Sequence, residues 1–231
     1  MAKDKKSLIE KIKPTDFKDL LRRIVLLICI CVFCYSAYNL GSIFLEYKQM
    51  DDSNKKIRVV SKEVPLPLSD EDKTLLFKMH EFLVNSQDPE LSKKYDLRPA
   101  VGIAAIQLGI PKRMCAIHVL DYDSKGNVVK ANDYALVNPK IVSYTKKNSF
   151  LRDGEGCLSV NKEVQGYVPR HAKVTVEGYD LLTDQEVKIV ARGFLSICLQ
   201  HELDHFEGTL FYDRINKENP LAPIPNAMVI D

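Results

Sequence analysis

"GFLSICLQHELDHFEG", residues 193–208, combines an apolar helical pattern with a cluster of polar side chains. Its apolar residues fall on nearly every face of a helix: Phe194, Leu195, Ile197, Cys198, Leu199, Leu203 and Phe206. A helix without a solvated face belongs in a core. His201 and His205 are four residues apart, so both imidazoles lie on one face and can bind one ion. Burying this polar cluster costs on the order of several kcal/mol unless it is paired or metal-bound, so the stretch predicts a metal-binding core helix.

The ligand set of this helix is incomplete. Glu202 lies beside the two histidines, where it can act on a water molecule without binding the metal. A catalytic metal needs a third protein ligand and an open position. A histidine at the spacing HExxHxxGxxH is excluded because Phe211 stands there, and Glu218 lies in a turn-like stretch close to the motif.

Cys157 is the favoured third ligand. It stands alone in "RDGEGCLSVNKE", residues 152–163, with no nearby cysteine or histidine to explain it. We expect Gly154 and Gly156 to hold it in a tight loop and to present a thiolate on a strand beside the helix. A metal ion explains this isolated thiol.

The remaining pattern predicts an α+β fold, with antiparallel strands packed around the central HExxH helix. Ser69 can cap a helix that carries an apolar stripe and closes at Pro89. Short β-branched runs follow at 113–120, 134–144, 172–180 and 186–192. We interpret His80, His118 and His171 as packing or structural residues rather than ligands.

The N-terminal region predicts a membrane anchor. Residues 24–45 contain no charged side chain, which is enough length for one transmembrane helix. Residues 1–23 hold eight Lys and Arg, which favours a cytoplasmic N-terminus and an exported C-terminal domain, but lysines soon after the apolar run weaken that bias. We expect 46–56 to be a linker and 57–231 to be a metal-dependent catalytic domain.

Composition limits the partners. The net charge of +2 is too small to indicate nucleic acid, and we predict no direct binding to it. The six cysteines match no disulfide framework: Cys29, Cys31, Cys34, Cys115, Cys157 and Cys198.

A third stretch, "RPAVGIAAIQLGIP" at residues 98–111, has small residues that let a peptide backbone come close. Together, "AVGIAAIQ", "EGCLS" (155–159) and "HELDH" (201–205) resemble the motifs of peptide deformylases, particularly the longer type of Gram-positive bacteria. Residues from "YSAYNLGSIFLEYKQ" onward also resemble the membrane anchor of class B sortases. Ala100 and Ile106 depart from the deformylase pattern, and we expect both to alter the substrate cleft.

The deformylase resemblance implies the roles of the site residues. Cys157, His201 and His205 would bind the metal, and Glu202 would be the general acid and base. The Gln107 side chain and the backbone N–H of Leu158 would stabilise the oxyanion. The substrate would contact four further residues: Gly102, Ile103, Ile197 and Cys198.

The resemblance also implies the reaction. The enzyme would hydrolyse the N-formyl group from formyl-methionine on nascent chains at the ribosome and release formate. The metal would be Fe²⁺, with Zn²⁺, Ni²⁺ or Co²⁺ as substitutes. Two alternatives stay open: an anchored extracytoplasmic metallopeptidase or amidase, and a tethered binding module with a structural metal. Nascent substrates place the catalytic domain in the cytoplasm, against the N-terminal charge.

Overall fold

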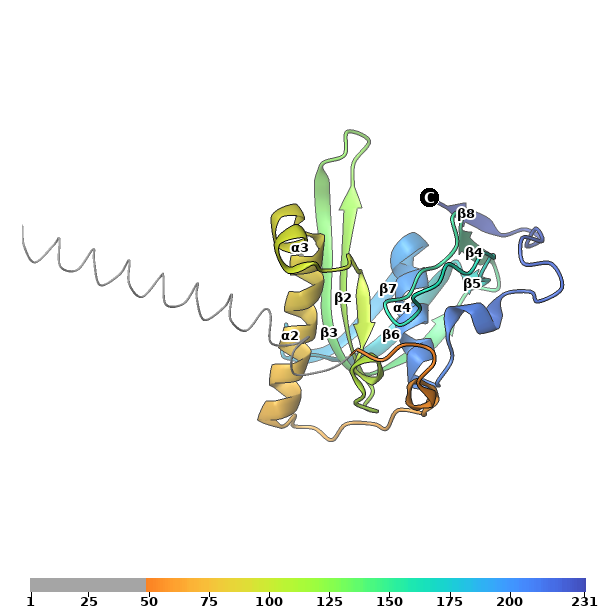
Figure 1. Cartoon of the computed structure of the whole chain (residues 1–231). Coiled ribbons are helices and arrows are strands. Elements are labelled where there is room, and N and C mark those ends of the chain that lie inside the picture. Colours follow the sequence, from red (N-terminus) through yellow and green to blue (C-terminus); the bar gives the residue numbers. More distant parts are fainter. Residues whose placement is uncertain (1–48) are drawn as a thin grey trace, which may run out of the picture. The chain divides into compact units, whose positions relative to one another are not determined.

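The computed structural model describes residues 49–231, which form two sheets and their covering helices (Figure 1). The elements in chain order are η1 (Lys55–Arg58), α2 (Asp70–Gln87), α3 (Pro89–Tyr95), β1 (Gly102–Ala104), η2 (Ala105–Leu108), β2 (Met114–Tyr122), β3 (Val128–Tyr144), β4 (Asn148–Leu151), β5 (Arg170–His171), β6 (Lys173–Asp180), β7 (Gln185–Arg192), α4 (Gly193–Phe206), η3 (Phe211–Arg214) and β8 (Met228–Ile230). The predicted α+β class is confirmed.

The larger sheet is antiparallel and has the strand order β1-β2-β3-β6-β7. Its four long strands cover the β-branched runs that the sequence predicted. The smaller sheet has the order β5-β4-β8, and its strand β8 pairs with β4 in parallel. The short strands β1, β4, β5 and β8 were not predicted, because runs of two to four residues carry no clear alternation.

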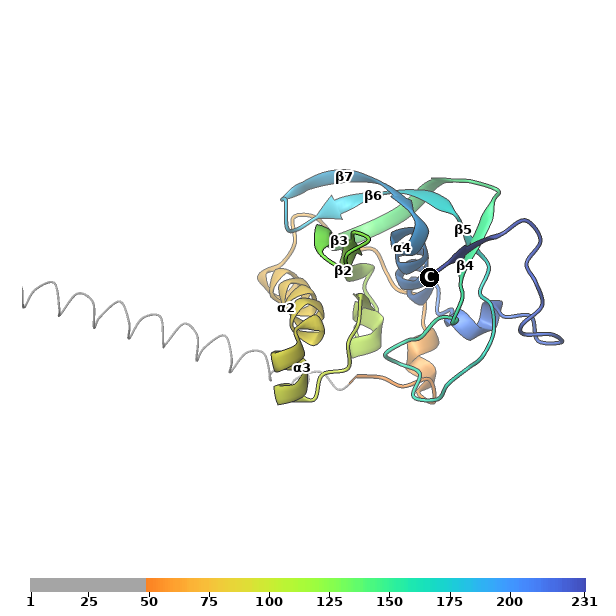
Figure 2. The same ribbon diagram turned by 90° about the horizontal axis from the view of Figure 1, so that it is seen from above.

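The larger sheet carries one long helix on each face, with α2 on one side of β2 and β3 and α4 on the other (Figures 1 and 2). Strand alternation produces this arrangement. Met114 and Ala116 of β2 pack toward α2, whereas Cys115 and Ile117 pack toward α4. Every residue of α4 is buried or half-buried, so the prediction of a central core helix is confirmed.

The helix α2 begins as its sequence predicts. Ser69 is the N-cap, and its hydroxyl accepts a hydrogen bond from the Asp72 N–H at 3.1 Å. Pro89 does not simply close this region, as expected, but starts α3. A proline is favoured in the first turn because it lacks only an N–H that has no helical partner there, and Asp88 caps the new helix by accepting from the N–H groups of Glu90 and Leu91.

The expected basic segment 1–23 and the expected transmembrane helix 24–45 lie outside the described residues. Within residues 49–231, no helix has the length and apolar character needed to cross a bilayer. Part of the expected linker packs on the domain: the Met50 N–H donates to the Gln107 carbonyl at 2.8 Å. Asn54 caps η1, and Ile57 within η1 is fully buried.

We predict that Gly208→Ala destabilises the protein far more than Gly126→Ala. Both glycines have a positive φ, +67° and +81°, which costs an alanine about 1–2 kcal/mol. Only at Gly208 would the new Cβ also meet backbone, 2.1 Å from the Arg58 carbonyl oxygen. Forced overpacking adds about 1–3 kcal/mol. Urea unfolding of both variants measures the difference, and equal losses would contradict the close approach at Arg58.

We also predict that the ion pair between Arg58 and Asp213 stabilises the fold in a pH-dependent way. Burial acts to raise the pKa of Asp213, but hydrogen bonds from Arg58 and from the Leu210 N–H outweigh it and lower that pKa. A lowered carboxyl pKa gives stability that is present above pH about 4 and is lost as the pH falls through the folded-state pKa. Both side chains are partly exposed, so the contribution is about 1 kcal/mol at most.

Asp213→Asn removes this contribution. Its free energy of unfolding should therefore lie below that of wild type at pH 7 and approach it below pH 4. A gap between the two proteins that stays constant over this range, in denaturant titrations at each pH, would assign the loss to something other than ionisation.

Candidate metal centre

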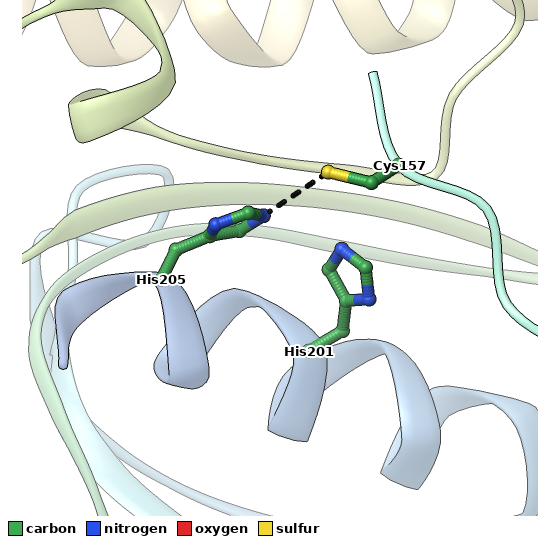
Figure 3. A group of neighbouring side chains, drawn as sticks. All are labelled: Cys157, His201 and His205. Carbon is green, nitrogen blue, oxygen red and sulfur yellow. Dashed lines mark hydrogen bonds between the residues drawn. The ribbon is translucent and has the colours of Figure 1, made fainter. Parts of the chain in front are cut away.

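The helix α4 places His201 and His205 one turn apart, and both rings rise toward Cys157 (Figure 3). Their ring centroids are 5.0 Å apart. The His205 Nε2 lies 3.4 Å from the Cys157 sulfur. One ligand atom from each of the three residues lies within 4.8 Å of the others. The structure thus brings together the three side chains that the sequence proposed as a ligand set.

Cys157 lies in the loop between β4 and β5, not on a strand as expected. In a strand, the sheet would fix the direction of the Cys157 side chain through the alternation of side chains. A loop does not impose this constraint. Gly154 has a φ of +79°, which a residue with a side chain rarely adopts. The conformation at Gly154 turns the loop, and the nearly buried thiol faces α4.

The donor set fits a transition metal. One thiol and two imidazoles are soft to intermediate ligands that suit Zn²⁺ or Fe²⁺. Burial lowers the pKa of His205 well below its usual value, which favours the neutral ring that a metal requires. Burial also acts to lower the pKa of His201, but contacts with Cys157 and Glu155 raise it. A divalent cation at the same atoms would take the place of that proton.

A buried network of charges orients His201. Its Nδ1 lies 2.8 Å from Glu155 Oε2, which leaves Nε2 for a metal. Arg170 donates two hydrogen bonds of 2.8 Å to Glu155 and a third, of 2.5 Å, to Asp204. Burial alone would raise the pKa of Glu155, but Arg170 and His201 lower it to about 2. The carboxylate therefore stays ionised and fixes the His201 ring.

Glu202 is buried beside the three ligands and is itself 4% exposed. Burial raises its pKa to about 7. Its carboxylate lies against Gly102, where a Cβ would be 2.3 Å from Oε1, so only glycine leaves room. Among the described residues, its Oε2 has no hydrogen-bond partner. A buried, unpartnered carboxylate oxygen is costly unless it has a task such as accepting a proton.

Gln107 is held with its amide directed at the cluster. Its Oε1 accepts from the Ala104 N–H at 2.8 Å. Its Nε2 lies 3.5 Å from the Cys157 sulfur and 3.2 Å from the Ser159 hydroxyl. The side-chain N–H groups therefore point toward the loop that carries Cys157 and Ser159.

A cavity of about 390 Å³ opens onto this cluster. Its lining includes most residues that the sequence proposed: Gly102, Gln107, Cys157, Leu158, Ile197, Cys198, His201 and Glu202. Ile103 is not part of the lining but lies 1% exposed in the core beside α2. Because strand side chains alternate, Gly102 facing Glu202 of α4 turns Ile103 to the opposite face.

Several residues of the site were missed by the sequence analysis. Val101 and Phe194 line the cavity, and Glu155 and Arg170 make the charge network. The sequence held a signal for Glu155, because it stands two residues before the lone Cys157. An acid that is buried beside such a residue needs a partner. Ala100 also lines the cavity, as expected for a residue that alters the cleft, whereas Ile106 is buried in the core cluster beside α4.

Three comparisons with known proteins agree on the family that the chain resembles. The family model described as polypeptide deformylase matches residues 47–220. "Peptide deformylase 2" of Bacillus cereus is 49% identical over 166 residues, which covers 72% of this chain and 87% of that protein. "Peptide deformylase 2" of Bacillus subtilis is 46% identical over 180 residues, or 78% of this chain and 95% of that protein.

A solved structure matches in fold. The crystal structure of peptide deformylase from Ehrlichia chaffeensis has a TM-score of 0.60 and 27% sequence identity. The match covers 75% of this chain and 90% of the Ehrlichia chain. The matched family region begins at residue 47, so it gives no support to the sortase-like anchor that the first residues suggested.

We predict that Glu155→Gln weakens metal binding by about 10–100-fold. The amide keeps the size of the carboxylate, but its NH₂ group must face either His201 or Arg170, which are both donors. A competition titration with a coloured chelator measures the metal affinity. Glu163→Gln, an exposed position in the same loop, is the control. Equal affinities in the two variants would mean that Glu155 serves the fold alone.

Proposed function

The chain belongs to the peptide deformylase family, and from this we propose which of its residues perform the reaction. It hydrolyses the N-formyl amide of formyl-methionine at the start of nascent polypeptides and releases formate. Because the family has this activity, we do not propose either alternative for the chain. These were an anchored extracytoplasmic metallopeptidase or amidase, and a tethered binding module with a structural metal.

One observation carries the assignment of residues. Three stretches that are far apart in the sequence meet at one cavity: Gly102 to Gln107, Glu155 to Ser159, and His201 to His205. We assign Cys157, His201 and His205 as the metal ligands. When bound, the metal supplies Lewis acidity that lets a water molecule lose its proton near neutral pH.

Glu202 is the general base and then the general acid. It directly follows His201 and precedes His205 by three residues, and its carboxylate has one unpartnered oxygen within the described chain. It accepts a proton from the water whose oxygen bonds to the formyl carbon. It then gives that proton to the nitrogen as the C–N bond breaks, so that formate and a free amine leave.

Gln107 and Leu158 stabilise the carbonyl oxygen as it gains negative charge. The Gln107 amide is already fixed by the Ala104 N–H, so it needs little reorganisation when the charge develops. Leu158 follows Cys157 directly and lines the cavity. Each such donor is worth about 2.7–4 kcal/mol in the transition state.

The apolar part of the cavity holds the methionine side chain. Ile197 and Cys198 of α4 line it, together with Val101 and Phe194. These side chains give an apolar surface, which suits the flexible, unbranched thioether of methionine. For Ile103, which lies in the core, we propose no direct contact with substrate.

The family is metal-dependent, and we propose Fe²⁺ as the metal, with Zn²⁺, Ni²⁺ or Co²⁺ as functional substitutes. The set of one thiolate and two imidazoles accepts all four. Oxidation of Fe²⁺ or of the Cys157 sulfur would inactivate the enzyme, so the proposal requires a reducing compartment.

The cellular placement is part of the proposal. Formylated nascent chains are made in the cytoplasm at ribosomes, so we place the catalytic domain, residues 57–231 with the packed segment before it, on that side. Residues 24–45 keep the character of a membrane anchor in their sequence, with 1–23 before them and a short connection after.

The test is formate release from a formyl-Met tripeptide by protein prepared anaerobically with Fe²⁺ or Ni²⁺. Glu202→Ala should keep its metal and lose about 10²–10⁴-fold in turnover, because proton transfer is lost and the ligands remain. Cys157→Ala should lose the metal and the activity together.

The control is Glu207→Ala, which removes an exposed carboxylate just after α4. Its turnover should match that of wild type. If Glu202→Ala keeps full turnover with its metal bound, the assignment of the general base is wrong. If Cys157→Ala keeps metal at wild-type affinity, the ligand set is wrong.

A further inference from the structure

A second group of potential ligands lies away from the catalytic cluster. His80 of α2, His118 of β2 and Asp133 of β3 each offer one ligand atom, and these atoms lie within 4.8 Å of one another. Asp133 Oδ1 is 2.7 Å from His80 Nε2 and 2.6 Å from His118 Nδ1. The reaction uses none of the three residues.

The fold aligns this group from three separate elements. His118 and Asp133 are directly opposite each other in the antiparallel pair of β2 and β3. His80 comes from α2, which packs on that pair of strands. The side chains of His118 and His80 are 10% and 18% exposed, and that of Asp133 is 33% exposed. The ligand atoms are thus held by packed elements, yet they remain open to solvent on one side.

We propose that His80, His118 and Asp133 form a second transition-metal site, which binds Zn²⁺ or a similar ion between α2 and the β2–β3 pair. Two imidazoles and one carboxylate are the ligands of many three-residue sites for Zn²⁺ and Fe²⁺. The same set does not suit Mg²⁺ or Ca²⁺, which prefer oxygen ligands throughout. Water completes the coordination from the open side.

The geometry of the group favours a cation. Both imidazoles meet one oxygen of the Asp133 carboxylate, His80 through Nε2 at 2.7 Å and His118 through Nδ1 at 2.6 Å. A divalent ion would replace the two protons between these atoms, and each ring would carry its proton on the other nitrogen.

The site lies close to the substrate cavity along the backbone. The His118 N–H donates to the Val101 carbonyl at 2.9 Å, and Val101 lines the cavity. The Gln87 side-chain amide donates hydrogen bonds to the His118 and Ala100 carbonyls, at 2.9 Å each. Substitutions in the cluster can therefore change activity through this backbone, so activity cannot serve as the readout, and bound metal must be counted directly.

The experiment is equilibrium dialysis of the reduced full-length protein against buffered Zn²⁺, followed by elemental analysis. Cys29, Cys31 and Cys34 can also bind Zn²⁺, so the readout is the difference between matched variants. His80→Ala should bind one equivalent fewer than wild type. Cys157→Ala should also bind one fewer, and the double variant two fewer.

His171→Ala is the matched control, because His171 belongs to neither cluster. It should bind as much Zn²⁺ as wild type. Asp133→Asn is a second test that keeps the side-chain shape, and it should lose the same equivalent as His80→Ala. With Co²⁺, that lost equivalent should carry no sulfur-to-metal charge-transfer band, in contrast to the one lost in Cys157→Ala.

The proposal is overturned if His80→Ala and Asp133→Asn bind as much Zn²⁺ as wild type. The three residues would then be a hydrogen-bonded clamp between α2 and the sheet. The count is independent of turnover, so a failure here leaves the catalytic assignment untouched. Circular dichroism checks that each variant is folded before its metal is counted.

Discussion

The buried guanidinium of Arg170 holds the Cys157 loop and the helix α4 together. It binds Glu155 of the loop through two nitrogens and Asp204 of α4 through a third, and it is 3% exposed. Arg214 also donates to Asp204, at the same Oδ2 that accepts from Arg170. Losing one member of such a buried set leaves an uncompensated charge, which costs about 3–5 kcal/mol. The polar motif on α4 is therefore tolerable in a core because its acid at Asp204 and the acid of the loop share one cation.

The position of the cavity follows from the sheet. Among residues 49–231, the strand β1 is at the edge of the sheet and has only β2 beside it. The Val101 carbonyl accepts from His118 of β2, and backbone groups along a strand alternate in direction. The groups of Gly102 therefore point away from β2, and its missing side chain leaves space for Glu202. An edge strand whose outward backbone groups lie beside Glu202, our proposed general base, is suited to hold a peptide by main-chain hydrogen bonds.

The sequence predicted the parts of the site that lie in continuous motifs. A helical repeat places His201 and His205 on one face whatever surrounds them, and a lone Cys157 in a polar loop is conspicuous. The charge network escaped prediction because Glu155, Arg170 and Asp204 are related only by the folded chain. The wrong expectation of a strand at Cys157 has a similar origin, since the turn at Gly154 depends on contacts rather than on alternation. Pro89 was misread because a proline that ends one helix equally suits the first turn of the next.

The two ligand clusters differ in a way that separates catalysis from metal binding alone. In the cluster of Cys157, His201 and His205, the first two residues line a cavity, Glu202 has an oxygen with no partner among residues 49–231, and Gln107 directs its amide at Cys157. At His80, His118 and Asp133, the acid of the group would itself bind the proposed metal, and within residues 49–231 neither cavity that adjoins the Cys157 loop includes the group. A metal there would lack a base and a bound substrate. Ligands alone therefore make a site for an ion, and in our proposal the general acid, the oxyanion donors and the cavity make the first cluster catalytic.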